Sequence, residues 1–487
     1  MDLTWLLLHS TLALDVVGMA IRIAAIAIVP VNRRPSSAMA WLLAIFLIPY
    51  IGVIAFLLIG NPKLPAHRRR KQREVNRVIL ERTKGMDQLP PDDPGPPWLA
   101  SVVQLNRNLG AMPMVTGNAA RLIEDYDASL QELTDAVDGA REYVHCEFYI
   151  LSSDAATAPF FAAMERAVQR GVTVRVLFDH IGSYRSPGYR ATKKHLERIG
   201  VLWRPMLPVQ PLRGKYQRPD LRNHRKLLVI DGDVAYMGSQ NLIDASYNKR
   251  ANRRRGLQWK ELMVRLEGPI VGGVNALFVT DWYSETDETL EGEIEPVDPR
   301  VARDTLECQV VPSGPGFEDE NNLKLFNSLI YNAQQRVSIT SPYFVPDESL
   351  MHAVTTAAER GLSVELFVSE IGDQPLVFHA QRSYYEALLR SGVRIYLYPA
   401  PYILHAKHLT IDDEIAVIGS SNMDMRSFGL NMEASLLVSG HDFTDEMRGI
   451  EDGYRAVSRE LTLEQHQGRS WPGKIVDNLA RLTSALQ

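Results

Sequence analysis

Hydrophobic residues are concentrated in two long runs at the start of the chain. The second run, residues 38–59 (AMAWLLAIFLIPYIGVIAFLLI), carries no charge and has the length of a helix that spans the core of a bilayer. The first run, residues 3–29, is interrupted by Asp15 and Arg22, which lie two helical turns apart and can share one face. We predict a membrane hairpin of two hydrophobic helices, with a re-entrant or interfacial helix as the alternative for the first.

Beyond residue 98 the pattern changes to short segments in which helix and strand periodicities alternate. Residues 162–179 (AAMERAVQRGVTVRVLFD) show an amphipathic helix, an Arg-Gly stop and a β-branched strand, and residues 352–369 (HAVTTAAERGLSVELFVS) show the same order. A strand pattern precedes each copy, and a further helix, glycine and strand follow it. This repetition predicts an α/β fold of two tandem domains, each with a mixed sheet flanked by helices.

Proline and hydropathy place the domain boundaries. Residues 85–98 (GMDQLPPDDPGPPW) contain five prolines, which predicts a stiff linker. The predicted parts are the membrane segments (1–60), a basic stretch with the linker (61–98), the first α/β domain (99–295) and the second (296–487).

The last residues of the chain predict a further helix. One of its faces is apolar and is formed by Ile475, Leu479, Leu482 and Leu486. We expect this face to pack on the second domain, with membrane contact as the alternative.

Composition adds a charge asymmetry to this picture. The chain has 487 residues, 45% of them hydrophobic and 23% charged, as in globular proteins, and a net charge of -5. Residues 61–84 nevertheless hold nine Lys or Arg and only two Glu. Positive flanks stay on the cytoplasmic side, so we expect cytoplasmic catalytic domains. The same stretch could bind anionic lipid or be a plain stop-transfer flank. Cys146 and Cys308 form no disulfide framework or zinc pattern.

Candidate chemistry lies in a motif that occurs once in each predicted domain. His224, Lys226 and Asp231 have the same spacing as His405, Lys407 and Asp412. Each triplet is followed by a Gly-Ser-x-Asn segment, which adds Ser239 and Asn241 in the first copy and Ser420 and Asn422 in the second. Six identities at fixed spacing, found twice, exclude coincidence.

The residues of the motif suit attack on an anionic ester. Each copy predicts a β-hairpin with Asp at the turn, and His and Lys, two residues apart, share a strand face. Histidine acts as nucleophile or acid–base near neutral pH, lysine supplies positive charge, and Ser and Asn donate hydrogen bonds. We predict that His224 and His405 face each other across one phosphorus atom, one forming a phosphohistidine and the other moving protons. No metal or other cofactor is required.

The motif aspartates belong to the candidate catalytic set by position only. Asp231 and Asp412 fall at hairpin turns, where aspartate is common for local reasons. We expect structural or hydrogen-bonding roles for both.

The doubled HxKxxxxD-GSxN signature is that of the phospholipase D superfamily. The segments LLIGNPKLPAHRRR, HCEFYIL, LRNHRK, SPYFVPDESL and NMDMRSFGLNME also resemble bacterial cardiolipin synthases over nearly the whole chain. The resemblance implies pseudo-twofold symmetry, one shared active site, and an acidic residue after each motif that orients a histidine. Glu433, 28 residues after His405, fits this role. In the first half the corresponding position 252 is Asn, so Glu261 becomes the candidate, displaced by a basic insertion at residues 248–256.

The resemblance also implies the reaction. His224, by family analogy the nucleophile, would take a phosphatidyl group from phosphatidylglycerol, and His405 would act as acid–base. A second phosphatidylglycerol would then attack, giving cardiolipin. Alternatives are a membrane-anchored phospholipase D that hydrolyses phosphatidyl lipids and a transferase that uses phosphatidylethanolamine as one substrate.

Two other classes of function fit the sequence less well. A nuclease of the superfamily would be expected to show a broad basic surface rather than a bilayer anchor, so no nucleic-acid partner is expected. A non-catalytic scaffold would have no use for paired His-Lys-Asn sets.

Overall fold

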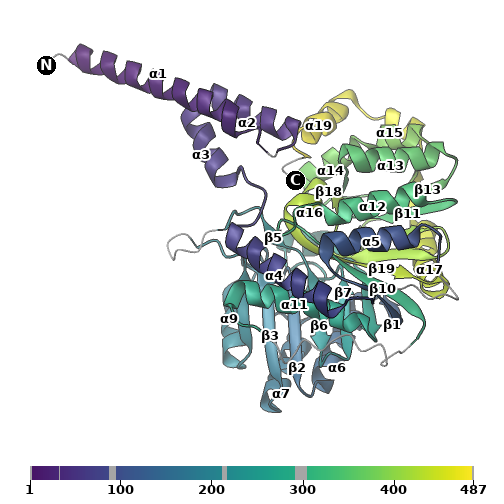
Figure 1. Cartoon of the computed structure of the whole chain (residues 1–487). Coiled ribbons are helices and arrows are strands. Elements are labelled where there is room, and N and C mark those ends of the chain that lie inside the picture. Colours follow the sequence, from purple (N-terminus) through teal and green to yellow (C-terminus); the bar gives the residue numbers. More distant parts are fainter. Residues whose placement is uncertain (1–2, 32, 87–94, 211–216, 291–303, 485–487) are drawn as a thin grey trace. The chain divides into compact units, whose positions relative to one another are not determined.

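The computed structural model describes residues 3–31, 33–86, 95–210, 217–290 and 304–484 (Figure 1). The chain divides into two compact units, Met1–Lys63 and Leu64–Gln487. Part of the predicted linker, residues 87–94, and the predicted boundary between the two α/β domains at residue 295 lie outside the described residues.

The N-terminal unit consists of helices α1 (Leu3–Ile28), α2 (Pro35–Leu47) and α3 (Pro49–Ile59). The prediction of one helix over residues 38–59 is wrong, because the chain breaks at Ile48, whose φ of -135° and ψ of 76° are not helical. Pro49 explains the break, since a proline disfavours the helical conformation in the residue before it.

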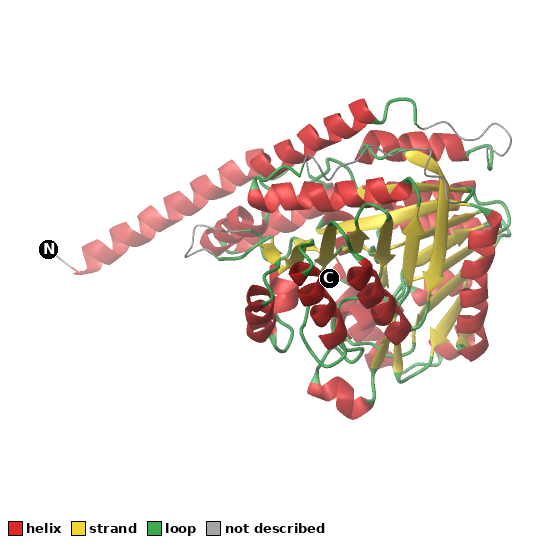
Figure 2. Ribbon diagram, turned by 90° about the horizontal axis from the view of Figure 1, so that it is seen from below, coloured by secondary structure: helices red, strands yellow, loops and turns green. Residues whose placement is uncertain are grey.

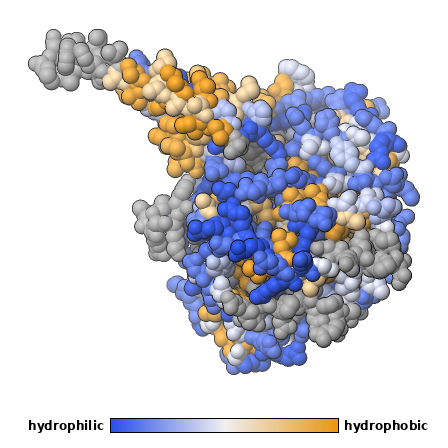
Figure 3. Space-filling model, in the orientation of Figure 1, coloured by the Kyte–Doolittle hydropathy of each residue, from blue (hydrophilic) through white to orange (hydrophobic). Residues whose placement is uncertain are grey.

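From residue 13 on, where side chains are described, the helices of the N-terminal unit leave most of their apolar side chains exposed. A small cluster of buried side chains holds them together, formed by Ala25, Val29, Ala38 and Ile45. Apolar side chains cover much of the rest (Figure 3), and Leu47 and Leu57 are 72% and 76% exposed. Within the described residues, none of the helices has the combined length and apolarity that crossing a bilayer requires. The two predicted spans are therefore not confirmed.

The larger unit is built on one continuous mixed sheet with helices on both sides (Figure 2). Its first-half strands, in their order across the sheet, are β4 (Leu202–Met206), β3 (Thr173–Asp179), β2 (Tyr143–Phe148), β6 (Lys226–Ile230), β7 (Val234–Gly238), β9 (Met263–Glu267) and β1 (Met114–Ile123). The second half continues with β10 (Leu306–Ser313), β19 (Asn431–Ser439), β17 (Ile415–Gly419), β16 (His408–Ile411), β11 (Arg336–Thr340), β13 (Ser363–Ser369), β14 (Arg394–Tyr398) and β20 (Arg459–Leu461). Except for β20, the second run mirrors the first, which confirms the predicted duplication.

Short strands and helices complete this unit. The short strands are β5 (Arg222–Asn223), β8 (Gln258–Lys260), β12 (Phe344–Val345), β15 (Tyr402–Leu404) and β18 (Met423–Asp424). The helices up to the middle of the chain are α4 (Ala66–Arg82), α5 (Leu99–Gly110), α6 (Tyr126–Gly139), α7 (Ala158–Gln169), α8 (His180–Tyr184), α9 (Tyr189–Arg198), α10 (Arg250–Arg255) and α11 (Ile270–Thr286). The remaining ones are α12 (Asn321–Asn332), α13 (Glu348–Glu359), α14 (Pro375–Arg382), α15 (Tyr385–Arg390), α16 (Met425–Gly429), α17 (His441–Val457), α18 (Leu463–Gln467) and α19 (Trp471–Arg481).

The repeated helix–glycine–strand segments fold as predicted in both halves. Helix α7 leads into β3 and helix α13 into β13. Gly171 and Gly361 end these helices with φ of 90° and 92°, a conformation that glycine adopts without the steric cost of a side chain. The repeat is therefore visible in backbone geometry as well as in sequence.

A large apolar cluster joins the two halves. It combines side chains from α11, β6 and β9 of the first half with others from α17, β10 and β19 of the second. Because burial of apolar area drives folding, a core shared in this way fixes one half against the other. Residues that lie far apart in the sequence can therefore be held together at the junction.

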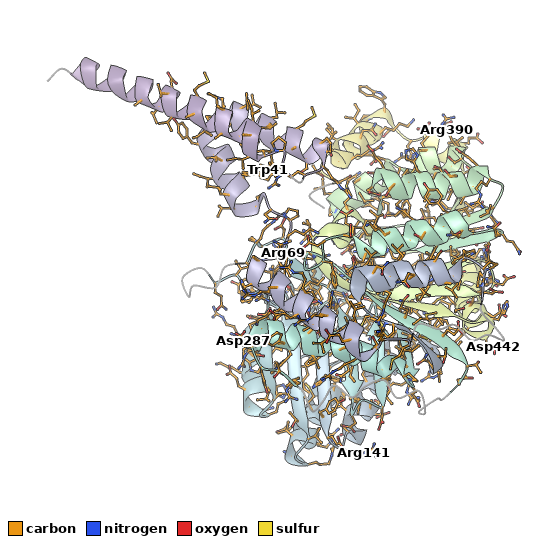
Figure 4. All side chains as sticks on the ribbon, viewed as in Figure 1. Trp41, Arg69, Arg141, Asp287, Arg390 and Asp442 are labelled. Carbon is orange, nitrogen blue, oxygen red and sulfur yellow. The ribbon has the colours of Figure 1, made fainter. Side chains whose placement is uncertain are left out.

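The basic stretch that precedes the predicted linker folds as helix α4 and packs against α11. Arg68 forms a bidentate pair with Glu285 at 2.8 and 2.9 Å, and Lys71 lies 2.5 Å from Asp287. Figure 4 labels Asp287 and Arg69 in this region. Arg69 lies 3.3 Å from Glu318. Several cations of the stretch, for which lipid binding was one of two interpretations, are thus paired within the protein.

The prediction for the C-terminal helix is wrong in its orientation. Helix α19 buries Asp477 and Ala480 and leaves Leu479 59% and Leu482 81% exposed. The buried carboxylate of Asp477 lies 2.7 Å from His379 and 2.5 Å from Arg469. These ion pairs turn the polar side of the helix inward, so its apolar side faces out. Leu486 lies outside the described residues.

Candidate active site

Each motif histidine is positioned by a strand that crosses to the other half. Strand β5, just before His224, pairs in parallel with β19 of the second half. Strand β15, just before His405, pairs in parallel with β8 of the first half. The pairing continues one step further, because the His224 N–H donates to Met432 O (2.8 Å) and the His405 N–H donates to Lys260 O (2.7 Å). The two histidines thus occupy equivalent positions in a pseudo-twofold junction.

The crossed strands place each glutamate on the histidine of the opposite half. Met432 and Lys260 are followed directly by Glu433 and Glu261. His224 Nδ1 lies 3.0 Å from the Glu433 carboxylate, and His405 Nδ1 lies 2.8 Å from Glu261 Oε1. We expected each glutamate to follow and orient the histidine of its own motif, and the structure corrects this. Since Nδ1 of each ring faces a carboxylate, Nε2 is directed away from it.

The motif lysines lie beside these histidines. Nζ of Lys226 donates to His224 O, and Nζ of Lys407 donates to His405 O. The Lys226 ammonium also lies 5.3 Å from the centre of the Tyr149 ring. Both lysines are nearly fully buried, at 2% and 3% exposure, so they bring positive charge to a place that water hardly screens.

Burial and mutual repulsion change the protonation of these cations. Burial, helped by the positive charges of Lys226 and Lys407 and opposed by Glu433 and Glu261, lowers the pKa of His224 and of His405 to about 4. Burial also lowers the pKa of Lys226 to about 7 and that of Lys407 to about 8. Each lysine acts on the histidine of the other half as well as its own, as expected for one shared cluster of charge.

The glutamates remain ionised in this cluster. Burial alone would raise the pKa of Glu433, but His224 and Lys226 outweigh it and hold the pKa below its usual value. His405 and Lys407 do the same for Glu261. At neutral pH, therefore, each neutral imidazole faces a carboxylate that fixes its proton on Nδ1 and leaves Nε2 as the basic nitrogen.

The serines of the motif hold the glutamates. The Ser420 hydroxyl donates to Glu433 Oε2 (2.5 Å) and accepts from the Ala434 N–H (3.0 Å). Ser239 bonds to Glu261 and accepts from the Leu262 N–H (2.9 Å). We predicted substrate contacts for both serines, and in the structure their hydroxyls are already engaged by protein groups.

The two asparagines differ in their surroundings. Asn241 accepts from the Ile150 N–H (3.0 Å) and donates to the Tyr247 hydroxyl (2.8 Å), which in turn lies 3.2 Å from Glu261. Asn422 is also buried, and within the described part of the chain its Oδ1 has no hydrogen-bond partner. Asn422 is therefore the better placed of the two for the predicted substrate contact.

The motif aspartates lie away from the histidines, at the turns of the predicted hairpins. Strands β6 and β7 form the first hairpin and β16 and β17 the second. Asp231 accepts from three consecutive backbone N–H groups, those of residues 141–143, each at 2.8 Å. Asp412 accepts likewise from residues 334–336 at 2.7–2.9 Å. Each aspartate ties its turn to the start of β2 or β11, a structural role in agreement with our interpretation.

Replacing Asp231 with alanine is expected to lower the free energy of unfolding by about 2–4 kcal/mol, because three backbone donors lose a charged acceptor. Activity per folded molecule should stay close to that of the wild type. Urea denaturation of the full chain in detergent, followed by circular dichroism, measures the loss. The matched control is Asp233→Ala, which removes only an exposed ion pair with Arg141 (Figure 4) and should cost no more than about 1 kcal/mol. Equal losses in the two variants would contradict the proposed role.

Two tyrosines that we did not predict stand over the histidines. The Tyr149 ring lies edge-on to His224 at 4.9 Å between centres, and the Tyr343 ring lies edge-on to His405 at 6.2 Å. Strand pairing aligns Val144 with Val337, so Tyr149 corresponds to Pro342 and the two tyrosines are offset by one position in the repeat. An alignment of the two halves does not superpose them, so the signal in the sequence is limited to a tyrosine shortly after the strand of each copy.

The basic insertion forms the short helix α10 near the site. Arg253 contacts Asn248 Oδ1 at 2.5 Å, and Arg254 and Arg255 are exposed. The insertion thus separates Glu261 from its motif along the sequence without disturbing the symmetry of the site.

The assembled site can bind and attack a phosphate diester. Two lysines neutralise an anion, and two imidazoles with oriented Nε2 atoms can act on opposite sides of one phosphorus. Among the described residues, no group of three or more His, Cys, Asp or Glu side chains is arranged as a metal site.

Comparison with known families agrees with this geometry. The family model described as "Cardiolipin synthase, PLD-like domain" matches residues 133–271 and 326–450. A second model, described as the N-terminal region of phospholipase D-nucleases, matches residues 19–61. The first model therefore covers both halves of the repeat, including both histidines.

Curated relatives are similar over almost their whole length. Cardiolipin synthase A of Proteus mirabilis is 31% identical over 471 residues, covering 93% of this chain and 94% of the relative. The enzyme of Pectobacterium atrosepticum is 31% identical over 504 residues, covering 99% and 98%. Among solved structures, a phosphatidylserine synthase of Haemophilus influenzae superposes with a TM-score of 0.58 at 15% identity, covering 80% of this chain and all of that one. That likeness shows the fold alone.

Proposed function

Because the chain belongs to the family of cardiolipin synthases with phospholipase D-like domains, we propose that it transfers a phosphatidyl group between two phosphatidylglycerol molecules. The products are cardiolipin and glycerol. One observation carries the proposal. Two histidines from different halves, each held through Nδ1 by the glutamate of the other half, lie in one cluster with two buried lysines.

The reaction follows from this arrangement in two displacements. Nε2 of His224 attacks the phosphorus of the first lipid, the bond from phosphorus to the glycerol oxygen breaks, and His405 gives that oxygen its proton. The terminal hydroxyl of the second phosphatidylglycerol then attacks the phosphohistidine while His405 takes its proton. The phosphorus–nitrogen bond breaks and cardiolipin leaves. One phosphate ester replaces another, so no nucleotide is consumed.

The lysines and the bound phosphate supply the charges that this sequence requires. Lys226 and Lys407 neutralise the phosphate as its negative charge redistributes in the transition state. The bound phosphate anion in turn raises the pKa of His405, whose low value in the ligand-free protein results from burial and lysine repulsion. His405 can then carry the proton that the leaving oxygen needs.

The assay that tests the proposal gives the purified protein phosphatidylglycerol vesicles as its sole lipid. Cardiolipin and glycerol in equal amounts are the expected products. Phosphatidic acid with glycerol would establish the hydrolytic alternative, and absence of any product would exclude both. Addition of phosphatidylethanolamine to the same vesicles asks whether a second lipid donor or acceptor is used.

Activity is expected to fall at alkaline pH because Lys226 and Lys407, with pKa values of about 7 and about 8, lose their charge. Since kcat/KM reports the free enzyme, it should fall at least about tenfold per pH unit above pH 8. A monomeric short-chain phosphatidylglycerol avoids the surface pH of vesicles. In Lys226→Arg, whose side chain keeps its charge, the alkaline fall of kcat/KM should reflect the titration of Lys407 alone. A kcat/KM that stays constant up to pH 9.5 would contradict this assignment.

The protein is membrane-associated, as its family and the N-terminal family model indicate. In more detail, we propose a multi-pass protein of the bacterial inner membrane with cytoplasmic catalytic domains. The uncharged run at residues 38–59 and the cations that follow it support this orientation. Helix α19 supports contact with the bilayer, because it exposes Trp471, Leu479 and Leu482, and tryptophan favours the membrane interface.

A further inference from the structure

A group of three polar side chains extends from His405 toward the surface. The Tyr343 hydroxyl donates to Asp373 Oδ1 (2.8 Å) and accepts from Gln374 Nε2 (2.9 Å), while the Tyr343 ring stands over His405. We call these three residues the Tyr343 group. Together with Ile403, which lies two residues before His405 in the sequence, they line a small cavity.

Hydrogen-bond acceptors of the Tyr343 group remain available. Among the described residues, the Asp373 carboxylate accepts hydrogen bonds from the Tyr343 hydroxyl and from its own backbone N–H, whereas a carboxylate offers about four acceptor positions. Gln374 is exposed and uses only its amide nitrogen in the contact with Tyr343. The group therefore presents oxygen atoms that can accept hydrogen bonds from a ligand.

The equivalent place in the first half has a different chemistry. Strand β3 is followed by His-Ile-Gly-Ser and strand β13 by Glu-Ile-Gly-Asp, so Ser183 corresponds to Asp373. Ser183 is 1% exposed, and its hydroxyl accepts from the Leu151 N–H (3.2 Å) and donates to Tyr149 O (3.3 Å). It offers nothing to a ligand.

The charges around the two tyrosines differ as well. Besides burial, the pKa of Tyr149 responds to the charge of Asp179 and to the opposing charges of three arginines, Arg426, Arg222 and Arg185. Asp179 is itself engaged by Arg222 at 3.1 Å and by the Asn223 N–H. Besides burial, the carboxylates of Asp373 and Asp424 raise the pKa of Tyr343. Arginines therefore predominate on the His224 side, whereas the His405 side combines carboxylates with Lys249 and Lys407.

This asymmetry distinguishes the two ends of the substrate. Arginine donates hydrogen bonds and accepts none, so it suits a phosphate, whereas a carboxylate suits hydroxyl groups. In an in-line displacement the leaving alcohol lies opposite the nucleophile, next to the group that protonates it. The glycerol headgroup, which carries two free hydroxyls, should then lie on the side that offers acceptors.

We propose that Tyr343, Asp373 and Gln374 form a subsite for the adjacent hydroxyls of a glycerol headgroup, so that alcohols enter and leave on the side of His405. The inference rests on the proposed phosphatidyl transfer and deepens it. It assigns the acid–base role to His405 and the nucleophilic role to His224 from the structure itself, where the duplicated motifs are symmetric. It also gives the site a means to favour a glycerol headgroup over water.

The test measures how one intermediate divides between two alcohols. Vesicles of phosphatidylglycerol with a deuterated headgroup are given to the full-length protein with equal concentrations of unlabelled glycerol and ethanol. Mass spectrometry counts unlabelled phosphatidylglycerol, phosphatidylethanol, phosphatidic acid and cardiolipin. The ratio of the glycerol product to the ethanol product does not depend on how fast the intermediate forms.

Asp373→Asn is expected to lower this ratio about tenfold, because a charged acceptor for hydroxyl groups becomes neutral. Gln374→Leu, at an exposed position where folding is not at risk, should lower it in the same direction to a smaller extent. Glu370→Gln is the matched control, since Glu370 lies on the same loop but pairs with Arg459 at 3.0 Å. It should leave the ratio unchanged.

The outcomes separate the two proposals. A ratio within twofold of the wild type in both Asp373→Asn and Gln374→Leu would overturn the glycerol subsite while phosphatidyl transfer stands. A wild-type protein that forms neither cardiolipin nor any exchanged lipid would overturn the transfer itself. The ratio depends only on the molecules that form product. A variant that is partly unfolded therefore still shows whether the glycerol subsite exists.

Discussion

Replacing His224 with alanine is expected to lower cardiolipin formation by more than about 10⁴-fold, because the atom that bonds to phosphorus is removed. His405→Ala should cause a loss of about 10²–10⁴-fold, the usual contribution of a positioned acid–base group. The two variants should differ in what accumulates. Without His405, attack by His224 is slow, but transfer of the phosphatidyl group from the phosphohistidine to an alcohol is slower still. The phosphatidyl-enzyme therefore persists.

The measurement is a rapid quench with ³²P-labelled phosphatidylglycerol followed by analysis of protein-bound label under alkaline conditions, in which phosphohistidine survives. Label should accumulate on His405→Ala and be absent from His224→Ala. His352→Ala, an exposed position on α13, serves as the control and should behave as the wild type. Label on the His224→Ala protein, or substantial turnover by either variant, would contradict the two-histidine mechanism.

Much of the fold could be predicted because its signals are local. The helix–glycine–strand order of α7 and β3 recurs in α13 and β13, and the hairpins at Asp231 and Asp412 follow from strand patterns that meet at a turn. A duplicated motif also implies a common site whatever the details of the fold. These features depend on residues that are neighbours in sequence.

The crossed glutamates could not be predicted in the same way. They depend on β5, a strand of two residues, and β15, a strand of three. The partner of β5 begins at Asn431 and the partner of β15 at Gln258, so each partner is distant in sequence. Such short strands carry no periodicity from which a partner could be read. Only the packing of one half on the other determines which glutamate reaches which histidine.

The errors in the peripheral helices have different causes. In residues 38–59 the uninterrupted apolar composition concealed Pro49, which divides the run into α2 and α3. In α19, hydrophobic periodicity predicted a buried apolar face. The ion pairs of Asp477 with His379 and Arg469 determine the opposite orientation. A hydrophobic pattern identifies a face but does not say whether protein or membrane covers it.

The crossed geometry has a consequence for each half of the reaction. Glu433→Gln should lower turnover by about 10²–10⁴-fold, because an amide no longer holds the Nδ1 proton of His224 and the imidazole loses its reactive tautomer. Glu261→Gln should cause a loss of similar size through His405. Each glutamate should affect the step that the histidine of the other half carries out. Glu433, in the second half, governs formation of the phosphohistidine, and Glu261, in the first half, governs its transfer to the acceptor.

Single-turnover kinetics with labelled phosphatidylglycerol can resolve the two steps. Glu433→Gln should slow the appearance of protein-bound label, whereas Glu261→Gln should let label appear and then persist. Glu124→Gln, which removes only an exposed pair with Lys260, is the control for loss of a carboxylate near the site. If Glu433→Gln accumulated label and Glu261→Gln did not, each glutamate would be acting on its own motif. The strand exchange at β5 and β15 would then not be the arrangement in which catalysis occurs.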